Sequence, residues 1–333
     1  MSDYDLLPVC LKILHDTFIL GKEYYYFQPI DLNKITIRKL KKNTNFNHDN
    51  YLEDITYLGK INDYQIYSHP STPYSYNILF SLYSKDNQHL NDIERFEINS
   101  VKMLYLLSEV CHYHQVRHIS LPVMNFDIQF NELEDSIKYK LLGDSEDIVL
   151  VQIIEGFNDT YTFLEYYNKY GLTEEEWKIL IYQVLYTIIK ISKKYPQFRH
   201  NSLDIKSLLF QRDESIHDNF KIYNFNTEVF KFDNMKFITK IFDFRESTMN
   251  EDTVAKDNIF HDIHYFLHSI IFFFDEIERE LPYSLRLFIE SIVPENLRYR
   301  QLNFRGVRDT LLDNVEFNFS DMFENIFFSN YKI

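Results

Sequence analysis

Small residues are scarce in this chain, and their scarcity excludes several kinds of site. Alanine occurs once, at Ala255, and only six of the 333 residues are glycine. The sequence contains no Walker A loop, no G-x-G-x-x-G and no G-x-S-x-G, which are the motifs of P-loop nucleotide sites, dinucleotide-binding folds and α/β-hydrolases. Because 45% of the residues are hydrophobic and 17% aromatic, we expect a sizeable core packed with large side chains.

Cysteine is equally rare. Cys10 and Cys111 are the only two; they cannot form the dense disulfide framework of a small secreted domain, and neither belongs to a Cys-x-x-Cys pair. The N-terminus carries acidic residues where a secretory signal carries basic ones, and apolar runs such as Ser269–Phe274 are far shorter than a membrane span. We therefore expect a protein of a reducing compartment that is not secreted and does not span a membrane.

Positive charge is also in deficit. The chain has 35 Lys and Arg against 50 Asp and Glu, and its formal net charge is −15. A broad electrostatic grip on nucleic acid or on an anionic membrane needs clustered basic residues. The balance therefore excludes nucleic acid as an expected partner and is compatible with a basic protein partner.

The first half of the chain reads as mainly strands. Residues 55–84 hold three β-branched and aromatic runs separated by turn residues. Leu90–Cys111 has apolar residues at three- and four-residue steps and is predicted to be a helix. The remaining expectations are a short helix at Ser2–Phe18, a loop at Asn33–Asn50, and strands at His118–Val123 and Ile148–Glu155.

The second half reads as mainly helices. Thr173 and Glu176 form a capping box that predicts a helix over Thr173–Tyr195, which Pro196 ends. Other helices are predicted at Tyr161–Tyr170, Ile259–Phe274 and Ser284–Ile292, with strands at Leu208–Phe210, Lys221–Tyr223, Glu228–Phe232 and Lys236–Phe242. This order indicates a β-rich N-terminal half and a helical C-terminal half.

One loop carries a specific resemblance. The long helix ends in KKYPQFRHNSLDIKSLLF, residues 193–210, and HDIHYFLHSI follows at 261–270. With the order of elements, these segments resemble the protein-kinase-like proteins of large nucleocytoplasmic DNA viruses, in which the first stretch reads KKYPxFRHNDLHxxNILV; the poxvirus virion serine/threonine kinase is a more distant relative. The resemblance implies an α+β, two-lobed protein-kinase-like fold, with an N-terminal extension at 1–50, an N-lobe at 51–155 and a C-lobe at 156–333.

The resemblance also marks a degenerate catalytic loop. His200 matches the family histidine, but Ser202 stands at the catalytic Asp and Ser207 at the Asn that holds a second Mg²⁺. A neutral hydroxyl is a poor base and a poor ligand for a hard cation. Asp204 lies two residues from Ser202. Either Asp204 replaces the missing base, or the loop is structural and His200 and Leu203 only pack.

The metal-binding Asp-Phe-Gly segment has two candidates. Asn224-Phe225-Asn226 lies at the ordinary distance from the loop, and Asp243-Phe244-Arg245 lies further on. The viral family inserts an extra strand pair before a V-K-I-x-D-F-D-x-S segment, and the strand-like residues 221–242 fit that insertion. We therefore prefer Asp243 as the one retained metal ligand; the alternative is an ordinary Asp after a strand.

The phosphate-binding side is degenerate as well. The best match to the glycine-rich loop is Leu58–Tyr67, in which only Gly59 remains, because Ile61 and Tyr64 occupy the other glycine positions. No lysine lies in the third strand; Lys85 comes just beyond it. Glu97 is the candidate helix acid, with a solvated helix Glu as the alternative.

Further positions have mainly structural readings. Asp262 matches the buried kinase Asp that braces the catalytic loop through hydrogen bonds. Three histidines of the same helix lie at helical spacing, at 261, 264 and 268. His264 and His268, one turn apart, are interpreted as a buried, hydrogen-bonded pair rather than as part of a metal site. The histidines at 112, 114 and 118 are interpreted as a polar surface turn.

Three hypotheses follow. The first is a viral pseudokinase that binds protein partners or forms part of the virion, without a cofactor. The second is an active atypical serine/threonine kinase that uses ATP and Mg²⁺. It would need Asp243 together with Asp204 or another acid, and Lys85 would bind the phosphates. The third is a structural virion protein without a kinase fold. We expect a location in the host cytoplasm or the virion.

Overall fold

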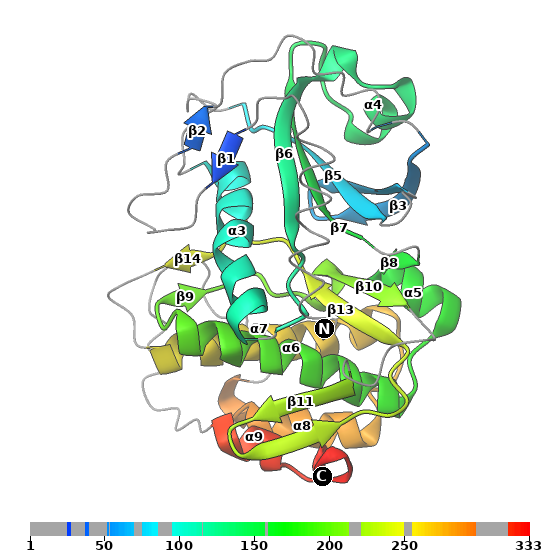
Figure 1. The fold of residues 1–333 in the computed structure, drawn as a ribbon. Coiled ribbons are helices and arrows are strands. Elements are labelled where there is room, and N and C mark those ends of the chain that lie inside the picture. Colours follow the sequence, from blue (N-terminus) through cyan, green and yellow to red (C-terminus); the bar gives the residue numbers. More distant parts are fainter. Residues whose placement is uncertain are drawn as a thin grey trace.

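A five-stranded antiparallel sheet forms one end of the molecule (Figure 1). Its strands are rich in β-branched and aromatic residues, as the sequence predicts. In spatial order they are β3 (Thr56–Ile61), β4 (Tyr64–His69), β5 (Tyr76–Leu82), β7 (Ile148–Glu155) and β6 (Pro122–Gln129). The helix α3 (Phe96–His114) runs beside β6 toward the other end of the molecule (Figure 1).

The structure is a computed structural model that describes residues 25–27, 37–39, 52, 54–69, 75–85, 95–114, 116–156, 159–212, 221–249, 255–297 and 319–333. The predicted helix at Ser2–Phe18 lies outside these residues. The expected loop at Asn33–Asn50 is wrong in part, because β1 (Tyr25–Phe27) and β2 (Ile37–Lys39) pair as a short antiparallel ribbon.

The sheet buries both of its faces, and alternate residues divide between them. Ile66 and Leu79 belong to the large core that continues into the rest of the molecule, whereas Tyr67 and Phe80 belong to a second core. The short helix α4 (Asp135–Leu141) closes that second core with Ile137. This helix lies in the connection between β6 and β7, and the sequence pattern did not predict it.

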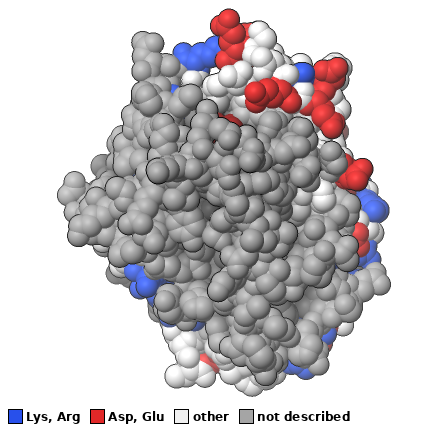
Figure 2. Space-filling view, turned by 45° about the horizontal axis from the view of Figure 1, so that its top comes forward, with Lys and Arg blue, Asp and Glu red and all other residues white. Residues whose placement is uncertain are grey.

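Acidic side chains gather on the surface of this connection. Within the described residues 130–147, the exposed acids are Glu132, Glu134, Asp135, Asp144 and Glu146. Figure 2 shows such side chains at the top of that view, toward the end that carries the sheet. The negative charge of the chain is thus visible on the described surface of the sheet end.

Helices form the other end of the molecule. They are α5 (Phe163–Tyr170), α6 (Glu174–Lys194), α7 (Ala255–Glu276), α8 (Tyr283–Ile292) and α9 (Phe319–Glu324). The predicted capping box is confirmed, since the Thr173 hydroxyl accepts the Glu176 backbone N–H at 3.3 Å and Glu176 accepts the Thr173 N–H at 2.9 Å. Trp177 of α6 packs against Phe274 of α7, with ring centroids 5.4 Å apart.

Short strands lie between the sheet and the helices. β10 (Leu208–Arg212) pairs with β13 (Phe237–Ile241) and with β8 (Thr160–Thr162), and β9 (Phe198–Arg199) pairs with β14 (Thr248–Met249). A separate hairpin of β11 (Ile222–Phe225) and β12 (Glu228–Lys231) corresponds to the extra strand pair that the resemblance implied.

The two ends share one continuous core. Ile61 and Tyr64 of the sheet lie in the same buried cluster as Leu209, Ile241 and Phe242 of the second part. A sheet end joined in this way to a helical end is the α+β, two-lobed, kinase-like fold that the sequence predicted. The boundaries at residues 50 and 155 stay a prediction.

A buried ion pair also crosses this junction. Lys240 of β13 pairs with Glu155 at the end of β7, and both residues are almost fully buried. Glu155 accepts the backbone N–H of Leu121 at 3.1 Å as well.

Among the helices that the structure describes, none has both the length and the hydrophobicity that a membrane span requires.

Candidate functional site

Asp262 braces the loop that matches the kinase catalytic loop. Its carboxylate, buried on α7, accepts the backbone N–H of His200 at 2.7 Å and that of Asn201 at 3.0 Å. Asn201 has φ +67° and donates to the backbone oxygen of Glu246 at 2.8 Å. These bonds hold 198–202 in a defined conformation beside the segment that contains Asp243.

The side chains at the catalytic-loop positions have structural contacts and offer little for catalysis. The His200 ring is buried beside Phe244, with centroids 5.0 Å apart, and burial lowers its pKa. Asp204 caps the 3-10 turn Ile205–Ser207, because its Oδ1 accepts the Lys206 backbone N–H at 2.7 Å. Ser202 is half-buried, and its backbone oxygen accepts the Asp204 N–H at 2.8 Å. The Asp204 carboxylate therefore already has a structural role.

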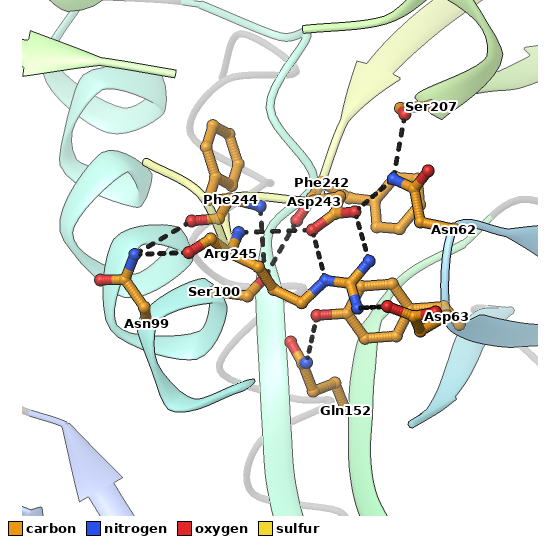
Figure 3. A network of polar contacts seen from close by, with 11 residues as sticks. Asn62, Asp63, Asn99, Ser100, Gln152, Ser207, Phe242, Asp243, Phe244 and Arg245 are labelled. Carbon is orange, nitrogen blue, oxygen red and sulfur yellow. Dashed lines mark hydrogen bonds and ion pairs between the residues drawn. The ribbon is translucent and has the colours of Figure 1, made fainter. Parts of the chain in front are cut away.

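Asp243 lies at the centre of a polar network (Figure 3). Arg245 binds its carboxylate in a fork: Nε donates to Oδ1 and one terminal nitrogen to Oδ2, both at 2.9 Å. Both side chains are buried. Although burial alone raises the pKa of Asp243, the hydrogen bonds and the charge of Arg245 hold that pKa below its ordinary value.

The turn between β3 and β4 closes over this pair. Asn62 donates from Nδ2 to Asp243 Oδ2 at 2.7 Å and to Ser207 Oγ at 3.3 Å (Figure 3). Asp63 accepts a hydrogen bond from the other terminal nitrogen of Arg245 at 2.9 Å. The turn has only these two residues, with Asn62 at φ +51°, a conformation that Asn tolerates. It thus joins the positions of both expected metal ligands.

The first turn of α3 fixes the same segment from another side. Asn99 donates from Nδ2 to the backbone oxygens of Arg245 and Ser247 at 2.9 and 2.8 Å. Ser100 Oγ accepts the Phe244 backbone N–H at 3.3 Å. The segment that follows Asp243 is therefore anchored to the sheet end through α3 as well as through the turn.

None of the three glycine-loop positions has the open surroundings that a bound phosphate requires. Gly59 has φ +152°, and a Cβ built there would lie 3.1 Å from Thr162 Cγ2, at the start of α5. Ile61 and Tyr64 are buried in the shared core. The Tyr64 hydroxyl accepts from Gln152 Nε2 at 3.0 Å, and its ring lies 5.9 Å from that of Phe242. Bulky side chains therefore fill the space below the turn.

Lys85 and Glu97 do not meet. The Lys85 side chain is 64% exposed, and its Nζ pairs with Asp144 at 2.5 Å and Asp147 at 3.1 Å, on the connection that carries α4. Glu97 is 3% exposed, so the alternative of a solvated Glu is wrong. Its Oε1 accepts the Ser84 backbone N–H at 2.6 Å, and its Oε2 lies 3.4 Å from Arg95 Nε.

The surface-turn interpretation is wrong for His118. This ring is buried, with Nδ1 at 3.0 Å from the Thr239 backbone oxygen and Nε2 at 3.1 Å from the Tyr223 hydroxyl. The side chains of His112 and His114 lie outside the described residues. His264 is buried and bonds the Leu297 backbone oxygen at 2.9 Å, as expected for a structural histidine. The described residues contain no cluster of ligands for a metal ion.

The second metal-segment candidate lies elsewhere. Asn224, Phe225 and Asn226 end β11 and begin the turn to β12. Asn226 accepts a hydrogen bond from Lys193 at 2.9 Å. The Asn224 backbone oxygen accepts the Tyr186 hydroxyl at 3.3 Å, so both asparagines bond α6. Asn62 instead joins Asp243 to Ser207, and this geometry favours Asp243 as the counterpart of the kinase segment.

The residues present do not fit Mg²⁺·ATP in this conformation. Both carboxylate oxygens of Asp243 are occupied by donors of Arg245 and Asn62, and Ser207 bonds the same amide. A divalent ion needs free oxygen ligands, and a triphosphate needs backbone N–H groups that approach it closely. In this structure the side chains of the turn between β3 and β4 form hydrogen bonds with other protein groups instead.

Sequence reasoning missed Asn62, Asp63 and Arg245. A signal for Arg245 was available: the viral pattern has Asp directly after Asp-Phe, and this chain has Arg there, which reverses the charge. Asn62 and Asp63 had no such signal, because their partners lie more than 140 positions away.

Among the comparisons with known proteins, the sequence match to one curated relative agrees with the kinase resemblance. No family model matches the chain. Among curated proteins, it is similar to "Putative serine/threonine-protein kinase R400" of Acanthamoeba polyphaga mimivirus, with 26% identity over 283 residues; the match covers 71% of this chain and 60% of that relative's length. Among solved structures, WaaP in complex with acyl carrier protein aligns over 73% of this chain and 80% of its own, at 10% identity and a TM-score of 0.36, which is too low to bear on the fold. The chain is thus similar in sequence to a kinase-like protein of a large DNA virus, and its own architecture is kinase-like.

Proposed function

We propose that this protein is a pseudokinase, a kinase-like fold that acts by binding other proteins and does not transfer phosphate. One observation carries the proposal: the carboxylate of Asp243 is saturated by Arg245 and Asn62. Phosphoryl transfer depends on positioned metal ions and charge neutralisation. A site whose retained acid already binds a guanidinium lacks the first requirement.

The other positions support the same proposal. Ser202 and Ser207 replace the base and the second metal ligand. Glu97 accepts a backbone N–H and forms an ion pair with Arg95, so it is not available to orient a lysine toward phosphates. Lys85 points to the α4 connection instead. These departures are independent of Asp243, and they act in the same direction.

An active atypical kinase is the second candidate, and two observations favour it. The mimivirus relative carries the name "Putative serine/threonine-protein kinase R400", and Asp262 still braces the loop as an active enzyme requires. Activity would need a conformation in which the turn at Asn62 leaves Asp243. It would also need a base in place of Ser202, a role for which Asp204 must give up its cap.

The partner is proposed to be a protein. The net charge of −15 and the exposed acids between β6 and β7 favour a partner with a basic surface. Host cytoplasm or virion remains the proposed location. A structural virion protein without a kinase fold is disfavoured by the observed architecture.

Binding of Mg²⁺·ATP to the purified protein tests the proposal. Thermal shift and calorimetry are expected to show no binding up to millimolar ATP, with or without Mg²⁺. A ligand at about 100 times its Kd would add about 2.7 kcal/mol of stability, so binding would be visible. A Mg²⁺-dependent shift in the wild type that disappears in Asp243→Asn, together with phosphotransfer to a protein, would establish the kinase alternative.

A further inference from the structure

The guanidinium of Arg245 has the surroundings of a bound cation. It lies between two carboxylates, Asp243 and Asp63, each 2.9 Å from one of its nitrogens. Its central carbon lies 4.3 Å from the centroid of the Tyr64 ring and 5.0 Å from that of Phe96, distances at which aromatic rings attract a cation. The Arg245 side chain is only 4% exposed. Every contact named here neutralises or satisfies positive charge.

We propose that Arg245 is a built-in cation that takes the place of a divalent metal ion beside Asp243, and that the Asn62–Asp63 turn latches onto it and keeps the site closed. The inference rests on the proposed function, since it assigns a cause to the closure of that site. Arg245 stands at the Gly position of the Asp-Phe-Gly segment, and Asn62 and Asp63 lie within the glycine-loop match. The kinase resemblance gives none of these three side chains a role.

The geometry explains why one residue has this effect. The fork of an Arg fits a carboxylate with two parallel hydrogen bonds, and here it binds Asp243, two residues earlier in the chain. The third donor reaches Asp63, 182 positions away. The same side chain therefore neutralises the retained acid and holds the sheet end against the second part.

Removal of the guanidinium would leave oxygen ligands around its place. Asp243 would keep both oxygens, one of them beside Asn62, with the hydroxyl of Ser207 bonded to the same amide. Asp63 would supply a further carboxylate from the turn, where its side chain is 73% exposed. Carboxylate oxygens suit Mg²⁺ and Mn²⁺, so Asp243 and Asp63 would supply the charged ligands. A variant without the Arg245 charge should therefore gain a divalent-cation site that the wild type lacks.

Manganese binding without nucleotide tests this inference. Arg245→Met keeps the aliphatic stem that packs on Tyr64 and Phe96 and removes the charge, whereas Arg245→Lys keeps the charge. We expect Arg245→Met to bind one Mn²⁺ by electron paramagnetic resonance, with a rise in Tm on addition of Mn²⁺. The wild type, Arg245→Lys and the double variant Arg245→Met with Asp243→Asn should show neither effect.

Several outcomes would overturn the inference. One is a folded Arg245→Met protein that binds no Mn²⁺ up to about 10 mM; another is a wild type that already binds Mn²⁺ in a manner that depends on Asp243. If Arg245→Met does not fold, hydrogen exchange of the Asp63→Asn and Asn62→Ala variants tests whether the turn acts as a latch. Exchange should rise together in residues 62–64 and 242–247, and an unchanged 242–247 segment would refute the latch.

The ATP experiment separates this inference from the proposed function. Suppose that the wild type does not bind ATP and that Arg245→Met does not bind Mn²⁺. The pseudokinase proposal would then stand, and the inference that Arg245 replaces a metal ion would be refuted. Mg²⁺-dependent ATP binding by the wild type, together with phosphotransfer to a protein, would instead contradict the proposed function, whatever the variants do.

Discussion

Asp262 Oδ2 accepts the backbone N–H of His200 at 2.7 Å, across 62 positions of sequence. Its other oxygen accepts the next backbone N–H, from Asn201. Both groups are buried, so the loop has no water to replace this acceptor. The bracing carboxylate is therefore a structural requirement of the loop, whether or not the loop performs chemistry.

Replacement of Asp262 by Asn should destabilise the protein and release the loop. The amide can accept at most one of the two bonds and presents its own N–H to the other donor, so we expect a loss of about 1.5–3 kcal/mol. Chemical denaturation measures the loss, and hydrogen exchange should show reduced protection at 198–202. Asp275→Asn, at an exposed position of the same helix, is the matched control. Equal stability of the two variants would contradict the bracing role.

The buried pair of Lys240 and Glu155 should show strong coupling. Lys240→Met leaves the Glu155 carboxylate buried without its counter-ion, which should cost about 3–5 kcal/mol. The double variant Lys240→Met with Glu155→Gln should recover most of that loss, because the amide is neutral and its oxygen can still accept the Leu121 N–H. A double-mutant cycle by urea denaturation gives the coupling. Simple additivity of the two single losses would show that the pair does not act as a unit.

Stability should fall as the pH falls below about 6.5, in part through His118. Burial lowers the pKa of His118 from 6.5 to about 3. Between these two values the unfolded chain binds a proton that the folded chain does not, so stability rises with pH in this window, by up to about 1.4 kcal/mol per unit. The full contribution is present above pH 6.5 and is lost progressively toward pH 3.

Urea unfolding of the wild type and of His118→Gln at several pH values between 7.5 and 4.5 measures this slope. Glutamine retains one donor and one acceptor for Thr239 and Tyr223 but does not titrate, so its slope should be smaller. His200, whose pKa burial also lowers, contributes equally to both proteins. Identical slopes would mean that His118 is not the titrating group.

Substitution of Gly59 by Ala should be unfavourable for two separable reasons. The backbone has φ +152°, which side chains rarely adopt, and the new Cβ would lie 3.1 Å from Thr162 Cγ2. We expect a loss of about 1–3 kcal/mol. The same substitution in a Thr162→Ser background removes the close contact and keeps the hydroxyl cap of α5, so it isolates the backbone strain. If Ala is tolerated in both backgrounds, Gly59 is not needed for the approach of β3 to α5.

Local sequence signals predicted the parts of the fold that depend on neighbours in the chain. Thr173 and Glu176 cap α6 through bonds over three residues. The apolar stripe that follows predicted the helix, although the structure buries most of its other side as well, including Gln183 and Thr187. The 193–210 loop and Asp262 were recognisable because residue type and spacing together match a known pattern. The helix α4 was missed, since its short apolar pattern does not stand out from the loop around it.

The candidate site was predicted only in part. Ser202, Ser207 and Asp243 were located from the loop and the strand pair that precedes Asp243. The burial of Glu97 was only one of two alternatives and that of His118 was not foreseen, because periodicity cannot distinguish a polar group with a buried partner from a solvated one. Each owes its burial to hydrogen bonds that the local pattern does not show, from Ser84 in one case and with Thr239 and Tyr223 in the other.

By itself, the sequence determined the α+β order of elements, the long helices and the serines at 202 and 207 in the loop that matches the kinase pattern, because these depend on residue types and short spacings. The tertiary structure alone decided that the retained Asp243 is neutralised by Arg245 and covered by Asn62. The physical reason is that a hydrogen bond or ion pair depends on distance in space. Asn62 and Asp243 are 181 positions apart in the chain and 2.7 Å apart in the fold.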